Sequence, residues 1–129
     1  MEREEIIGIV REIIDQLPDH IRENIKNLEF IIEDRPNPEI KRQFHGAMIL
    51  GLYQGIPLPK RGPGYTFVLP DRISLFYENL KKVVQNDGEW PRVLQDVILH
   101  EIGHYYGFNE MEIRKIMDEM KPKTEKEMD

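Results

Sequence analysis

The most informative part of the sequence is His100-Glu101-Ile102-Gly103-His104-Tyr105-Tyr106-Gly107-Phe108-Asn109-Glu110, which begins with the pattern His-Glu-x-x-His. On a helix, residues four apart lie on one face, so His100 and His104 can direct their imidazole rings at one point. Glu101 lies one residue round the helix from His100, and its carboxylate can reach a metal-bound water without being a ligand. The pattern therefore predicts a metal site carried by a helix.

The residues that follow predict where a third ligand comes from. Gly107 allows the helix to end through a left-handed residue, after which the chain folds back. Glu110 then lies in the first turn of the next helix and is the expected third ligand. Asn109 and Glu112 have the spacing of a capping box, which makes Asn109 a cap rather than a ligand. Glu112 is the alternative third ligand, and its capping spacing favours Glu110 over it.

The positions of these side chains around the helix also favour a metal site. One stripe at helical spacing contains Trp90, Val93, Val97, His100 and His104. We expect the imidazoles and Glu101 to face the apolar side of the helix. Burying them without partners costs several kcal/mol, whereas one metal ion satisfies all of them. The alternative is a pair of core histidines bonded to backbone or carboxylates, with Glu101 as their counter-ion.

Length and composition narrow the chemistry further. The chain has 129 residues and no cysteine, which indicates one domain (1–129) and excludes thiolate ligands and disulfides. Any metal is held by histidines and carboxylates. The formal net charge of −6 argues against a nucleic-acid binder. The N-terminus does not resemble a signal peptide, and the longest apolar run, near residues 47–52, is too short for a membrane span, so we expect a cytoplasmic protein.

Periodicity and turn residues predict an α+β domain in which helices flank short strands. The expected helices are an N-terminal pair within residues 1–27 (2–17 and 18–27), a helix over 87–106 and a last helix over 109–120. The expected strands are 28–32, 47–53, 65–69 and 72–77. Three Pro and three Gly make 55–64 a loop, and the polar residues 121–129 are expected to be a disordered tail.

The spacing His-Glu-x-x-His-x-x-Gly-x-x-ligand resembles that of the metzincin zinc metallopeptidases, although Glu110 stands where those enzymes carry His. With a carboxylate there, the chain is similar to a small bacterial family of minimal zincin-like proteins, predicted to be zinc metallopeptidases. Three other stretches fit that family: Gly51-Leu-Tyr53, Gly55-Ile-Pro-Leu58 and Leu69-Pro-Asp-Arg-Ile73. The resemblance covers roughly residues 28–117. It implies a minimal zincin-like fold, with a small mixed β-sheet packed against the active-site helix and flanking helices.

Metzincins also have a methionine-containing turn beneath the metal, well downstream of the third ligand. Here Met111, Met117 and Met120 all fall on the predicted last helix, where ordinary core packing is the favoured role. The resemblance therefore implies a shallow cleft that lacks the downstream wall.

These residues predict a zinc-dependent metallopeptidase, with Zn²⁺ or another divalent metal held by His100, His104 and Glu110. Glu101 is the expected general base, which accepts a proton from water and passes it to the leaving amine. The expected substrate is a peptide or an unfolded polypeptide. Two alternatives are a metal-dependent hydrolase of non-peptide amides or esters, and a non-catalytic metal-binding or protein-interaction module on a zincin core.

The remaining candidates have weaker signals. His20 and His45 are expected on the surface. Tyr105 and Tyr106 are candidates for stabilising an oxyanion, although packing is the favoured role for them. In zincins the edge strand beside the active-site helix guides an extended peptide, and residues 72–77 are a candidate for that strand. The equally favoured alternative is a plain core strand whose start, at Asp71-Arg72, forms a surface salt bridge.

Overall fold

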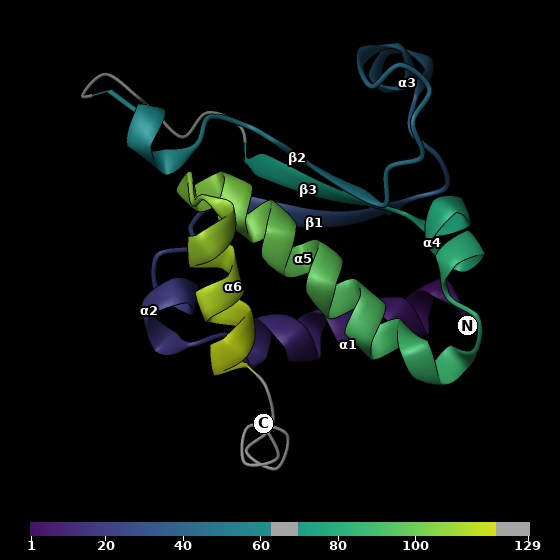
Figure 1. Cartoon of the computed structure of the whole chain (residues 1–129), viewed down its shortest axis with the longest axis horizontal. Coiled ribbons are helices and arrows are strands. Elements are labelled where there is room, and N and C mark those ends of the chain that lie inside the picture. The colour runs from purple at the N-terminus through teal and green to yellow at the C-terminus, as the bar shows by residue number, and fades with distance from the viewer. Residues whose placement is uncertain (63–69, 121–129) are drawn as a thin grey trace.

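The computed structural model describes residues 1–62 and 70–120 (Figure 1). Along the chain the elements are α1 (Arg3–Asp15), α2 (Asp19–Arg22), β1 (Leu28–Glu33), α3 (Pro38–Gln43), β2 (Gly51–Gln54), the 3₁₀ turn η1 (Leu58–Lys60), β3 (Asp71–Phe76), α4 (Tyr77–Val83), the 3₁₀ turn η2 (Asp87–Glu89), α5 (Trp90–Tyr106) and α6 (Glu110–Glu119). The α+β class is confirmed, and a small mixed sheet with flanking helices forms as expected.

Within the described residues, three strands form one sheet in the order β1-β3-β2. β1 is parallel to β3, with Leu28 opposite Asp71, and β2 is antiparallel to β3, with Tyr53 opposite Ile73. β3 is therefore the central strand and is buried along almost its whole length. The candidate edge strand at residues 72–77 is therefore not an edge strand, and the alternative of a core strand is confirmed. Among the described strands, the edge strand that lies against α5 is β2, which is partly buried except for the exposed Gln54.

Helices α1, α5 and α6 lie on the same side of the sheet (Figure 1). α5 contacts β2, β3, α1 and α6, so it passes through the middle of the hydrophobic core. The core combines Ile6, Val10 and Ile13 of α1 with Ile73 and Leu75 of β3 and with a row of α5 residues. The members of that row are Trp90, Val93, Leu94, Ile98, Leu99 and Ile102.

The turn between α5 and α6 forms as predicted. Gly107 has φ +75° and ends α5 in the left-handed region, which a glycine adopts without strain. Asn109 caps α6, because its side chain accepts from the Glu112 N–H at 2.9 Å while Glu112 accepts from the Asn109 N–H at 3.1 Å. Gly103 lets α6 approach α5 closely, since a Cβ there would lie 2.5 Å from Ile113.

Several predicted boundaries are corrected by the structure. The strand expected over 47–53 begins only at Gly51, and the helix expected over 18–27 is limited to α2. Helix α3 follows β1 where no helix is expected, because Asn37 caps it and Pro38 fits its first turn. Helix α4 follows β3 directly, so Tyr77 belongs to a helix rather than to a strand. The strand expected over 65–69 and the tail expected over 121–129 lie outside the described residues.

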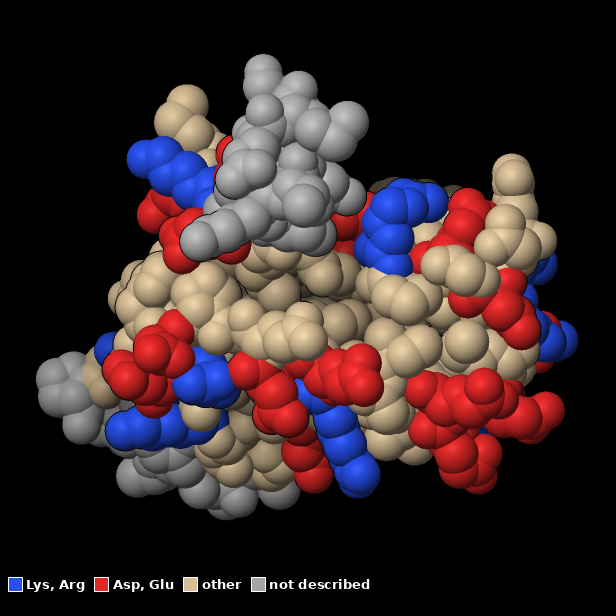
Figure 2. All heavy atoms as spheres, turned by 90° about the horizontal axis from the view of Figure 1, so that it is seen from below, with Lys and Arg blue, Asp and Glu red and all other residues tan. Residues whose placement is uncertain are grey.

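Figure 2 shows the molecule from below, with acidic side chains spread over that face and basic side chains between them. The view agrees with the excess of 24 Asp and Glu over 18 Lys and Arg. In residues 1–62 and 70–120, no helix combines the length and the apolar character that a bilayer crossing requires.

Candidate metal centre and active site

Helix α5 carries His100 and His104 on the side away from its core face, whereas Glu101 lies at the border of that face and is partly buried. His104 is exposed, and the His100 side chain is 43% exposed. The core face of α5 is centred near Ile98, and at 100° per residue the two histidines lie roughly 120–160° from it. The expectation that both imidazoles face the core is therefore wrong. Their position at the surface leaves both rings open to solvent and to a substrate.

His100 has a partner on each ring nitrogen. Its Nδ1 lies 3.3 Å from the carbonyl oxygen of Asp96, one turn earlier in α5. A carbonyl oxygen only accepts, so this is the contact that the Nδ1–H of a histidine makes when its Nε2 binds a metal. Nε2 lies 3.4 Å from Oε2 of Glu110, so two of the three predicted ligands are in contact.

The turn at Gly107 brings Glu110 back to His100. Glu110 is the first residue of α6, and its carboxylate is 72% exposed. Glu112, the alternative ligand, has its carboxylate in the capping box. His104 lies on α5 one turn beyond His100. In the described part of the chain, no three His, Asp or Glu side chains lie close enough together in this structure to hold a metal.

Glu101 is tied to the edge strand. Its Oε1 accepts a hydrogen bond of 2.8 Å from the backbone N–H of Tyr53 in β2. This bond leaves the Tyr53 N–H outside the ladder with β3. The approach of β2 to α5 depends on Gly51, because a Cβ there would lie 2.7 Å from Val97 Cγ1.

A surface pocket of about 350 Å³ lies where β2 meets α5. Its walls are the chain from Ile49 to Gly51 on one side, and Asp96, Val97, His100 and Glu101 of α5 on the other. The pocket therefore joins the predicted general base and one predicted ligand to the exposed edge of the sheet. A small group bound there would contact both side chains.

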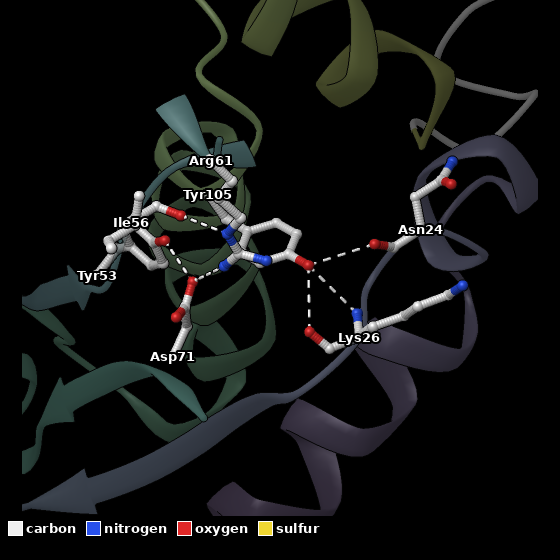
Figure 3. A network of polar contacts seen from close by, with 7 residues as sticks. All are labelled: Asn24, Lys26, Tyr53, Ile56, Arg61, Asp71 and Tyr105. Atoms are coloured by element: carbon white, nitrogen blue, oxygen red, sulfur yellow. Dashed lines mark hydrogen bonds and ion pairs between the residues drawn. The ribbon is translucent and has the colours of Figure 1, made fainter. Parts of the chain in front are cut away.

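A buried polar network, which sequence reasoning missed, is centred on Asp71 (Figure 3) and is joined to Glu101 through Tyr53. The Asp71 carboxylate pairs with the Arg61 guanidinium and accepts a 2.6 Å hydrogen bond from the Tyr53 hydroxyl. The side chains of Arg61 and Asp71 are only 8% and 5% exposed, so the expected surface salt bridge at Asp71-Arg72 is a buried one made by Asp71 alone. Burial, together with the hydrogen bond to Asp71, raises the pKa of Tyr53 above its ordinary value.

The signal for this network in the sequence was an ionisable residue, Asp71, directly before an apolar strand. The structure also explains Gly55, because a Cβ there would overlap the Asp71 carboxylate. The partner Arg61 lies in the loop before β3, and periodicity carries no information about pairing of that kind.

The other candidates have structural roles. Tyr105 is fully buried, and its hydroxyl accepts from the Lys26 N–H at 3.2 Å. The Tyr106 hydroxyl donates to the Ile21 carbonyl, and burial raises the pKa of Tyr106 to about 12. The surface positions predicted for His20 and His45 are confirmed.

The methionines of α6 divide between core and surface. Met117 and Met120 pack against the core as expected. Met111 does not, since it is 70% exposed.

The zincin-like metallopeptidase family model matches residues 25–120, from just before β1 to the end of α6. The chain belongs to the zincin-like metallopeptidase family. None of the curated proteins matches it. The match includes all four residues predicted for the site. The family is one of peptidases that in general depend on zinc and act on peptides.

The donor set of this zincin-like metallopeptidase fits zinc. Two imidazoles and one carboxylate form a ligand set of catalytic zinc sites, which keep a fourth position open. His100 Nε2 and Glu110 already lie together, and the hydrogen bond from Nδ1 to a carbonyl is the usual second contact of a zinc-binding histidine. The exposed His104 ring is free to change rotamer, since its side chain is not packed in the core.

Proposed function

We propose that this chain is a zinc-dependent peptidase in which His100, His104 and Glu110 hold the metal and Glu101 is the general base. The observation that carries the proposal is the contact of His100 Nε2 with the Glu110 carboxylate, next to a Glu101 held by the edge strand. When bound at these residues, zinc supplies an activated water and polarises the carbonyl of the bond to be cleaved.

The role of Glu101 follows from its tether to Tyr53. The Tyr53 N–H binds Oε1, so we assign proton transfer to the second oxygen, Oε2. That oxygen accepts a proton from the attacking water and then delivers it to the leaving amine. A carboxylate fixed at one oxygen keeps the other in a constant position, which is what repeated proton transfer requires.

The substrate is proposed to be a peptide or an unfolded polypeptide that lies along β2. Among the described strands β2 lies at the edge of the sheet next to α5, and an extended peptide can add there through the β2 backbone groups that Glu101 does not occupy. The pocket between residues 49–51 and α5 then receives a side chain or the scissile group. The open cleft favours short or unfolded chains over folded proteins.

The experiment that tests the proposal compares Glu101→Gln with the unchanged protein, both purified without a histidine tag. Glu101→Gln should keep its zinc, measured by elemental analysis, and lose about 10²–10⁴-fold of its activity on a fluorogenic peptide library. Glu112→Gln is the matched control and should retain activity, because a Gln side chain can still accept the capping hydrogen bond from the Asn109 N–H, whereas lost activity would favour Glu112 as the ligand. Undiminished cleavage by Glu101→Gln would remove Glu101 as the base, and zinc binding without any cleavage would assign the site to a non-catalytic module.

A further inference from the structure

A chain of contacts joins the buried ion pair to the proposed general base. The Arg61 guanidinium and the Tyr53 hydroxyl meet on one Asp71 carboxylate, and the backbone N–H of the same Tyr53 binds Glu101 (Figure 3 shows the first part). Tyr53 thus contacts the network with its side chain and the base with its main chain.

The Tyr53 ring is also held from the side of α5. Its ring packs edge-on against Tyr105, with 6.0 Å between centroids and an interplanar angle of 85°. Tyr105 lies four residues after Glu101, on the same side of α5. The Arg61 guanidinium lies 5.4 Å from the centre of the Tyr105 ring, and its Nε donates to the Ile56 carbonyl at 2.7 Å. Each of these contacts restricts where β2 lies relative to Glu101.

Stability alone is a weak reason for such a network. An ion pair as buried as that of Arg61 and Asp71 loses solvation that its attraction only partly restores, and apolar replacements are often as stable. What the pair adds is a defined geometry, because the carboxylate accepts from two donors that come from different segments, the 55–62 loop and β2.

We propose that Tyr53 and Asp71, with Arg61 behind them, are positioning residues that hold the Tyr53 N–H against Glu101 and so fix the general base. This inference rests on the proposed role of Glu101. None of the three side chains is a proposed metal ligand, and the proposed substrate would pair with the backbone of β2. The network acts on the hydrogen bond between the Tyr53 N–H and Glu101, so its loss should reduce turnover more than metal or substrate binding.

Tyr53→Phe is the informative variant, because it removes the hydroxyl bond to Asp71 and keeps the ring on Tyr105. For the zinc-loaded protein we expect kcat to fall about tenfold, with KM and zinc content changing by less than about twofold. Tyr106→Phe is the matched control. It also loses a partly buried hydroxyl bond, to Ile21, but Tyr106 is outside the network, and its kcat should be unchanged.

A second measurement is independent of activity. Amide hydrogen exchange at position 53, measured by NMR without substrate, should be at least about tenfold faster in Tyr53→Phe than in the unchanged protein and in Tyr106→Phe. Glu101→Ala, which removes the acceptor, sets the upper limit of that rate.

The two readouts separate the inference from the proposed function. Unchanged exchange at position 53 in Tyr53→Phe overturns the inference, as does an unchanged kcat in Tyr53→Phe when Glu101→Gln has lost activity. Faster exchange in Tyr53→Phe, combined with full activity of Glu101→Gln, supports the link from Asp71 to Glu101 and overturns the role of Glu101 as base.

Discussion

Tyr106 illustrates how one partly buried hydroxyl makes stability depend on pH. Burial first, and the neighbouring Tyr105 second, raise its pKa from 10.0 to about 12. Because the unfolded chain then loses this proton at a lower pH than the folded chain, the contribution is complete below pH ~10 and is lost as the pH rises toward ~12.

We expect the free energy of unfolding to decline over that interval, and to decline less steeply in Tyr106→Phe. Urea denaturation at a series of pH values measures both slopes, and ultraviolet absorbance of ionised tyrosine reports the titration directly. Equal slopes in the two proteins would show that Tyr106 titrates alike in the folded and unfolded chains.

The cap of helix α6 holds Glu110, the third proposed ligand, in position. Asn109→Ala removes the capping box and should lower the free energy of unfolding by about 1 kcal/mol. Fraying of that turn also moves Glu110, so zinc affinity should fall in a metal titration. Asn109→Asp keeps a side chain that caps well, and both quantities should stay close to those of the unchanged protein. Equal zinc affinity in all three proteins would show that the position of Glu110 does not depend on the cap of α6.

The elements that could be predicted are those determined by residues only a few positions apart in the sequence. Gly107 and the Asn109–Glu112 pair determine the turn from α5 to α6 over a few residues, and the structure reproduces that turn. The face of α5 was misjudged because the helix contacts the sheet, α1 and α6, so it is buried around much of its circumference. The spacing of apolar residues along α5 is then compatible with more than one core-facing side of the helix.

The contacts behind Glu101 were beyond prediction for a different reason. The hydrogen bond from Tyr53 to Glu101 spans 48 residues, and that from Tyr53 to Asp71 spans 18. Such pairs depend on strand order, and the sequence pattern did not reveal that β3 is inserted between β1 and β2.

For the molecule as a whole, we expect the metal to stabilise a fold that forms without it. The hydrophobic core joins α1, β3 and α5, and none of the three proposed ligands belongs to it. The chelated protein should therefore still unfold cooperatively. Zinc at about 100 times its Kd should add about 2.7 kcal/mol of stability, seen as a higher Tm in calorimetry.

His104→Ala provides the control for that measurement, because it should reduce the stabilisation by zinc and leave the chelated protein unaffected. Loss of structure on chelation would instead identify a structural ion.

The distances along the chain between the parts of the site have a consequence for folding. His100, His104 and Glu110 lie within a stretch of eleven residues, and only the three residues 107–109 join the two helices that carry them. Contacts this local form early, whereas the Tyr53 contact with Glu101 requires the sheet to be assembled first. If the proposed function holds, a nascent or partly unfolded chain would bind zinc before Glu101 is in position, and peptidase activity would require the completed fold.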